Sequence, residues 1–147
     1  MTVDEEIIRS RLIRLNGHLC RIEQKRPEPL SLILTDPDLQ DILSHNLEKA
    51  VQVCIDIASH VCVSYGRAPQ TAGDSFHALS ELGLIDRTLA DKMISAVGFR
   101  NVSVHEYAAV DWKIVMKIVA DGTEDLNAFG RWAASLVTLP QPAGSRI

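Results

Sequence analysis

The sequence has no excess of basic residues. Its 147 residues include 15 Lys and Arg against 19 Asp and Glu, which gives a formal net charge of -4 at pH 7. This balance disfavours a protein that holds nucleic acid on a globally basic surface, because the overall field weakly repels phosphates. An RNA substrate would need a local basic patch. The candidates for such a patch are Arg9, Arg67, Lys92 and Lys113.

Cysteine is also scarce, and no CxxC pair occurs. Cys20, Cys54 and Cys62 are odd in number and lie among apolar residues, which predicts buried, reduced thiols rather than a disulfide framework. His18 and Cys20 stand two positions apart, as do His60 and Cys62. On a helix such pairs point in well-separated directions, so the spacing argues against a metal site. We expect neither a metal nor a cofactor.

Long apolar runs are missing as well. None approaches the ~20 residues of a membrane span, and residues 1–6 are acidic where a signal peptide needs a basic stretch. Both absences predict a cytoplasmic protein without a membrane segment. The chain has no internal repeat or low-complexity tract, and its 147 residues fit one domain. We expect a single helical domain over residues 1–139 and a flexible tail over residues 140–147.

Helical periodicity is the dominant pattern that is present. Apolar residues make up 46% of the chain and recur every three or four positions in each long segment, which is typical of amphipathic α-helices. Residues 30–34 fit either a helical turn or a short extended piece. Residues 111–119 are rich in Val and Ile and leave a strand as a lesser alternative. The predicted helices begin at residues suited to cap a helix, namely Thr2, Asp36, Asp74, Asp86, Asp111 and Thr123.

These segments predict an all-α, up-and-down bundle of four to six helices. The connections are short, so successive helices should pack roughly antiparallel. The segment from Pro37 to about Ser64 is apolar on more than one side, because Val51, Ile55 and Val63 lie off its main seam. Such a helix is either central in the bundle or also part of an oligomer interface.

The segment GFRNVSVHEY, Gly98 to Tyr107, carries several chemically capable side chains. A helix advances about 100° per residue, so Arg100 and Tyr107 should lie nearly above one another. Asn101 and His105 are four residues apart and share the neighbouring strip. Gly98 costs a helix about 1 kcal/mol relative to alanine, and it lets a ligand or another backbone approach the turn of Arg100.

Arg100 and His105 form a sufficient minimal set for RNA cleavage without a metal. The 2′-hydroxyl must lose a proton as it attacks the neighbouring phosphorus, the leaving 5′-oxygen must gain one, and His can do either near neutral pH. Arg can stabilise the extra negative charge of the pentacoordinate phosphorus, and the product would be a 2′,3′-cyclic phosphate. A two-fold dimer would supply two His, for separate base and acid. On residue types alone, a solvated polar helix face with Tyr107 as a half-buried aromatic explains the same segment.

Residues 100–107 match the R-N-x-x-x-H-x-Y signature of the HEPN superfamily, in its HepT-like branch. The likeness is wider than this motif. Residues 36–41, 46–50 and 54–58 resemble the central helix of that branch, and residues 74–76, 82–85 and 110–111 resemble the flanks of its motif. The resemblance extends from Ile7 to Leu139.

The resemblance implies a small all-helical homodimer with its active site in a cleft at the dimer interface. It implies a metal-independent endoribonuclease toxin in which Arg100 and His105 are catalytic and Asn101 supports them by orienting His105. The partner would be a minimal nucleotidyltransferase antitoxin that transfers AMP to Tyr107, where the adduct would place negative charge beside Arg100. The competing interpretation is a non-catalytic helical module that completes a partner nucleotidyltransferase.

Overall fold

The computed structural model describes residues 3–105, 110–121 and 123–137, with the backbone alone over residues 102–105. Within these ranges no strand occurs, so the all-α prediction is confirmed and the strand alternative for residues 111–119 is wrong. The predicted tail over residues 140–147 lies outside them. The elements are α1 (Glu5–Lys25), the 3-10 helix η1 (Leu30–Leu34), α2 (Pro37–Ser64), α3 (Ala72–Glu81), α4 (Arg87–His105), α5 (Trp112–Ala120) and α6 (Glu124–Ala134).

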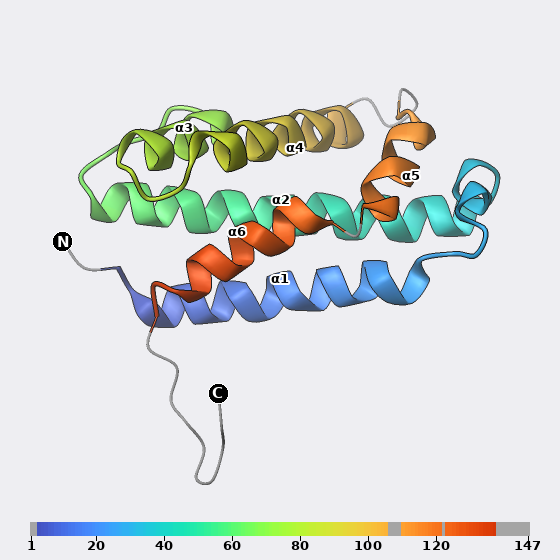
Figure 1. The fold of residues 1–147 in the computed structure, drawn as a ribbon, viewed down its shortest axis with the longest axis horizontal. Coiled ribbons are helices and arrows are strands. Elements are labelled where there is room, and N and C mark those ends of the chain that lie inside the picture. Colours follow the sequence, from blue (N-terminus) through green and yellow to red (C-terminus); the bar gives the residue numbers. More distant parts are fainter. Residues whose placement is uncertain (1–2, 106–109, 122, 138–147) are drawn as a thin grey trace, which may run out of the picture.

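Helix α2 is the axis of the bundle (Figure 1). Helix α1 lies along it and runs antiparallel to it, and α4 does the same on another side. Helix α3 packs on both α2 and α4. Helix α6 crosses diagonally over α1 and α2, and the short α5 stands steeply beside η1. The bundle prediction is confirmed, and α4, which carries the motif, rests on the most buried helix of the protein.

The two-sided apolar character of α2 reflects its central place. Half of its 28 residues are buried. Val51 and Ile55, which lie off the main seam, are 2% and 8% exposed, whereas Val63 near the end of the helix is 57% exposed. The chain itself therefore covers most of the second apolar side, and no oligomer interface is needed to explain it.

The core is built from regularly spaced side chains. In α1 the buried residues Ile8, Leu15 and Ile22 recur every seven positions and face α2 and α6. Phe76 of α3 and Phe129 of α6 meet edge to face with ring centroids 5.3 Å apart, and both side chains are fully buried. Edge-to-face pairs of this kind contribute about 0.5–1.5 kcal/mol beyond the area they bury. None of the described helices is both long and apolar enough to cross a membrane.

Two predicted helix starts are wrong. Helix α1 begins at Glu5 and is capped by Asp4, whose Oδ1 accepts hydrogen bonds from the backbone amides of Glu6 and Ile7, so Thr2 is not its cap. Helix α3 begins at Ala72 because Thr71 Oγ1 accepts from the Asp74 amide at 3.1 Å. In both cases a second residue able to cap stood two or three positions away, and the pattern alone could not choose between them. Three predicted caps are confirmed, at Asp36, Asp86 and Asp111.

Two further predictions need correction. Thr123 is the N-cap residue of α6, as predicted, but its side chain caps no first-turn amide. It sits in the left-handed region at φ 57°, and its Oγ1 accepts from Asn127 Nδ2. Cys20 is exposed on α1, where its thiol faces Asn16, although Cys54 and Cys62 are buried as expected. Cys20 lies between the buried residues Leu15 and Ile22 in the sequence, but its side chain does not point in their direction. It points to the solvent side of the helix instead.

Candidate active site

Helix α4 is held in place by its buried face. Asp86 Oδ1 accepts from the Leu89 amide at 2.7 Å and fixes the start of the helix, and Met93 and Val97 are buried. Arg100 follows Val97 by three positions and is partly buried, while Asn101 is exposed. The apolar side of α4 is therefore fixed in the core just before the motif begins. Of the first motif residues, Arg100 faces α2 and Asn101 faces solvent.

Arg100 is anchored to α2 by a hydrogen-bond relay. Its Nη1 donates to Gln52 Oε1 at 2.7 Å, across 48 positions of sequence. Gln52 Nε2 in turn donates to Asp56 Oδ1 at 3.0 Å, one turn further along α2. Both ends of the Gln52 carboxamide are used, which fixes the orientation of the amide and hence the place of the guanidinium. The Nε of Arg100 is buried and has no hydrogen-bond partner within the described part of the chain.

Asn101 is hydrogen-bonded to Arg100 in this structure. Arg100 Nη2 donates to Asn101 Oδ1 at 2.5 Å, so the oxygen of the carboxamide belongs to the arginine. Asn101 keeps its two amide hydrogens and a second lone pair on Oδ1 for another partner. The predicted assistance to His105 stays a prediction.

The structure shows contacts for some of the motif side chains, and the other side chains lie outside the part of the chain that it describes. Arg100 and Asn101 are in direct contact, and His105 ends the same helix five residues after Arg100. The structure describes the backbone of His105 but not its side chain, and Tyr107 lies outside the described residues. The predicted stacking of Tyr107 over Arg100 is therefore not tested.

Gln52 and Asp56 are the residues that sequence reasoning missed. Both lie in a stretch of α2 that is otherwise apolar, between Val51 and Val53 and between Ile55 and Ile57. Two polar residues four apart in a buried helix share one side of it and need partners. That interruption was a usable signal for a buried polar contact, although it gave no means of identifying Arg100 as the partner.

A pocket of about 210 Å³ opens beside the guanidinium, and we call it the Arg100 pocket. It lies where the start of α3 meets α2 and α4. Its lining comes from all three helices and from the α2–α3 loop, and it includes Gln52, Ile55, Ser59, Pro69, Gln70 and Arg100.

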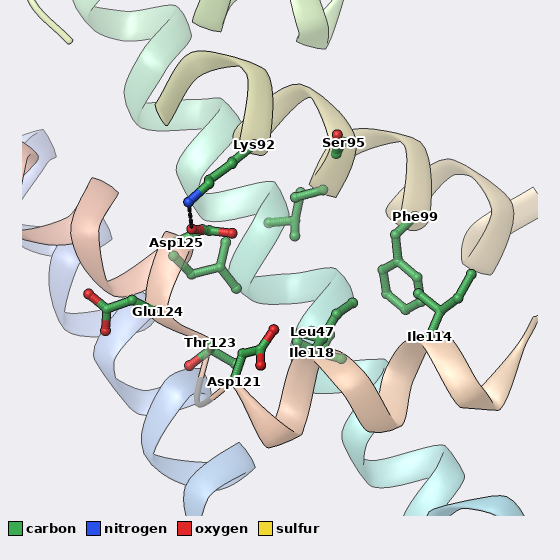
Figure 2. A pocket seen from close by; sticks show the side chains of 13 residues that line it. Leu47, Lys92, Ser95, Phe99, Ile114, Ile118, Asp121, Thr123, Glu124 and Asp125 are labelled. Atoms are coloured by element: carbon green, nitrogen blue, oxygen red, sulfur yellow. Dashed lines mark ion pairs between the residues drawn. The ribbon is translucent and has the colours of Figure 1, made fainter. Parts of the chain in front are cut away.

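A larger pocket of about 520 Å³ lies between α4, α5 and α6 (Figure 2), and we call it the acidic pocket. Its apolar lining includes Phe99 and Ile118. Its charged lining consists of Lys92, Asp121, Glu124 and Asp125. Lys92 is paired with Asp125 at 3.5 Å, so the carboxylates dominate the rim.

The basic residues proposed to grip RNA are mostly engaged in ion pairs. Arg9 pairs with Glu5, Arg67 with Glu81 at 2.6 Å and Lys92 with Asp125. Hydrogen bonding from Arg67 lowers the pKa of the Glu81 carboxyl. Lys113 at the start of α5 is exposed and pairs with no carboxylate among the described residues. Of the four candidates, Lys113 is the one whose charge no described carboxylate neutralises.

Comparisons with known proteins agree with one another. A family model described as Ribonuclease HepT-like matches residues 15–131. The mRNA nuclease HepT of Shewanella oneidensis is 33% identical over 125 residues, which cover 84% of this chain and 93% of that protein.

Solved structures point the same way. A tri-AMPylated HEPN toxin of Shewanella oneidensis, in complex with an MNT antitoxin, superposes with a TM-score of 0.82 at 32% identity and covers 88% of this chain and 97% of its own. A toxin–antitoxin complex with AMP-PNP gives a TM-score of 0.81 at 30% identity and covers 86% of this chain and 97% of its own.

Proposed function

This chain belongs to the HepT-like ribonuclease family, as its motif and flanks predicted, and from that membership we propose that it is the toxin of a toxin–antitoxin pair. In this proposal it is a cytoplasmic, metal-independent endoribonuclease that acts as a homodimer, with residues 1–139 as its single domain. The observation that carries the proposal is the fixed guanidinium of Arg100, which the Gln52 relay holds beside a pocket, on the helix that also carries His105.

The proposed reaction needs only these side chains and the RNA. The 2′-oxygen forms a bond to the adjacent phosphorus as its proton passes to a neutral His105, and the bond from phosphorus to the 5′-oxygen breaks as that oxygen takes a proton. The second His105 of a homodimer would deliver that proton. Arg100 stabilises the negative charge that grows on the phosphoryl oxygens, and a guanidinium that is already oriented pays no reorganisation cost when the charge develops.

The control of this activity is proposed to lie at Tyr107. A nucleotidyltransferase antitoxin would join the α-phosphorus of ATP to the tyrosine oxygen, with pyrophosphate leaving and the phenolic proton lost. A related toxin has been solved in a tri-AMPylated form with its MNT antitoxin, which supports this proposal. Each AMP adds a negatively charged phosphate, which would compete for the charge of Arg100 and fill the cleft.

A growth assay tests the toxin proposal. We expect expression of the chain alone to arrest growth, and we expect Arg100→Ala and His105→Ala, each at matched protein level, to restore it. A matched control is Arg87→Ala, which removes an exposed arginine from the first turn of the same helix. Arrest that persists in both active-site variants would refute the proposed chemistry.

The tyrosine proposal is tested separately by mass. Incubation with the partner nucleotidyltransferase and ATP should raise the mass of the chain by one or more AMP units, and Tyr107→Phe should abolish the gain. An equal gain in Tyr107→Phe would place the modification elsewhere. The alternative function, a non-catalytic module, predicts that the purified chain cleaves no RNA and that its complex with the partner modifies a third molecule.

A further inference from the structure

The two pockets around α4 differ in the charge that they would offer to RNA. The acidic pocket is the larger, but Asp121, Glu124 and Asp125 stand on its rim and its lysine is already paired. Figure 2 shows these three acidic side chains and the Lys92–Asp125 pair. Phosphates and base carbonyls would meet repulsion there. Among the described residues that line the Arg100 pocket there is no carboxylate, and Arg100 is the single charged one. Size favours the acidic pocket, whereas charge favours the Arg100 pocket, and for a polyanion charge decides.

The Arg100 pocket also holds polar groups that the chain leaves available. The oxygen and the nitrogen of the Gln52 carboxamide are each already engaged, with Arg100 and with Asp56. In contrast, the hydroxyl of Ser59 and the carboxamide of Gln70 make no hydrogen bond with other described residues. A carboxamide offers a donor and an acceptor side by side, which is the arrangement that reads the edge of a base.

The walls and the volume suit one base. Ile55 and Pro69 supply apolar surface against which a flat ring can pack. A volume of about 210 Å³ is smaller than the ~300–1,000 Å³ of pockets that enclose a whole drug-sized ligand. The space therefore fits one unstacked ring of a single-stranded substrate, with the rest of the nucleotide outside.

We propose that the Arg100 pocket receives one unstacked base of the RNA, next to the phosphate that Arg100 contacts, and that Gln70 and Ser59 select that base. The inference rests on the proposed ribonuclease function and adds to it a source of sequence preference. It places the specificity of cleavage on the loop between α2 and α3 and on the face of α2, away from the motif itself. Gln70 and Ser59 are specificity residues in this scheme and take no part in the proton transfers.

The first test is a cleavage profile. A pool of single-stranded RNA with every dinucleotide context is digested by the parent chain and by Gln70→Ala and Ser59→Ala, and the cut sites are counted. The controls are Gln24→Ala, an exposed glutamine on α1, and Ser95→Ala in the acidic pocket. We expect the parent to prefer one base beside the cut. We expect Gln70→Ala to lower cleavage at that context about three- to tenfold relative to the others, the worth of one hydrogen bond, while both controls keep the parent profile.

The second test is binding without turnover. In the His105→Ala background, fluorescence anisotropy measures the affinity for oligo-A, oligo-C, oligo-G and oligo-U. The parent background should discriminate between them, and Gln70→Ala should reduce the discrimination by the same factor that it changes the cleavage profile. Base-independent binding in both proteins overturns the inference, and so does a uniform loss of cleavage over all contexts in Gln70→Ala.

The two tests separate the inference from the proposed function. A chain that cleaves RNA with an unchanged profile in Gln70→Ala and Ser59→Ala keeps the ribonuclease proposal and loses the base pocket. A chain that cleaves no RNA but shows a base-dependent affinity that Gln70→Ala removes keeps the pocket and loses the proposed chemistry.

Discussion

Replacing Gly98 with alanine should make the protein more stable. Gly98 lies inside α4 and is exposed. Apart from its own helix backbone and its chain neighbours, no atom of the described residues lies within 4 Å of the position that a Cβ would take. The substitution therefore meets no steric penalty and gains the difference in helix propensity, about 1 kcal/mol. With an m-value of about 2 kcal/mol/M, the urea midpoint should rise by about 0.5 M. The melting temperature should rise by about 3 °C.

Gly130 provides the matched control. An alanine Cβ there would lie 3.1 Å from Cδ2 of Leu15, whose side chain is 2% exposed in the contact between α1 and α6. The same gain in helix propensity is then opposed by overpacking of the core, which costs about 1–3 kcal/mol. Gly130→Ala should leave the urea midpoint unchanged or lower it. Both variants are compared with the parent at one protein concentration, because the proposed homodimer would unfold at a concentration-dependent midpoint.

The stability and the activity of Gly98→Ala should move in opposite directions. If Gly98 exists so that RNA or a second copy can approach the turn of Arg100, the added methyl should lower the rate of RNA cleavage while the free energy of unfolding rises. A fall in the urea midpoint at an unchanged m-value would refute the reasoning from open space. Full activity in the stabilised variant would refute the reasoning from close approach.

Three further predictions concern other parts of the chain. One equivalent of iodoacetamide should label the native protein at Cys20, as read by mass, and Cys20→Ser should label slowly, because burial raises the pKa of the Cys54 thiol. Arg67→Ala should raise the pKa of Glu81 toward its ordinary value, as followed by NMR titration. Glu81 has its pKa lowered on folding, first by the hydrogen bond from Arg67 and also by the charge of His77. Its contribution to stability is therefore present above about pH 4.5 and is lost as the pH falls through the lower folded value. Acid unfolding should show this loss in the parent and a smaller one in Arg67→Ala. Phe129→Ala should lower the free energy of unfolding by about 3–5 kcal/mol in urea titration, and a cost below about 1 kcal/mol would contradict its place in the core.

The helices could be predicted because their signals are local. Asp36 followed by Pro37 starts α2 as the pattern indicates, and the seam of α1 is buried at Ile8, Leu15 and Ile22. Caps and periodicity depend on residues within one or two turns, so the sequence carries them directly. The errors at Thr2 and Asp74 arose where two residues able to cap a helix stood close together. Tertiary packing decides which of the two caps the helix.

The site could be predicted only in part, for a physical reason. Arg100 was identified through its motif, but its partner Gln52 lies 48 positions away on another helix. Nothing in the period of α2 indicates which residue of α4 will face Gln52, because that depends on how the two helices slide along each other. The left-handed backbone at Thr123 is a similar case, since a β-branched residue rarely adopts it without support from the surrounding fold.

The relay from Asp56 through Gln52 to Arg100 also acts as a spacer between opposite charges. A carboxylate placed directly on the guanidinium would hold it equally well, but the ion pair would neutralise the cation that a phosphate must find. The neutral amide of Gln52 is oriented by Asp56 and in turn orients Arg100, and it separates the carboxylate from the guanidinium by one side chain. The bundle thus holds its arginine in place and leaves its positive charge unneutralised, in a chain whose net charge is negative.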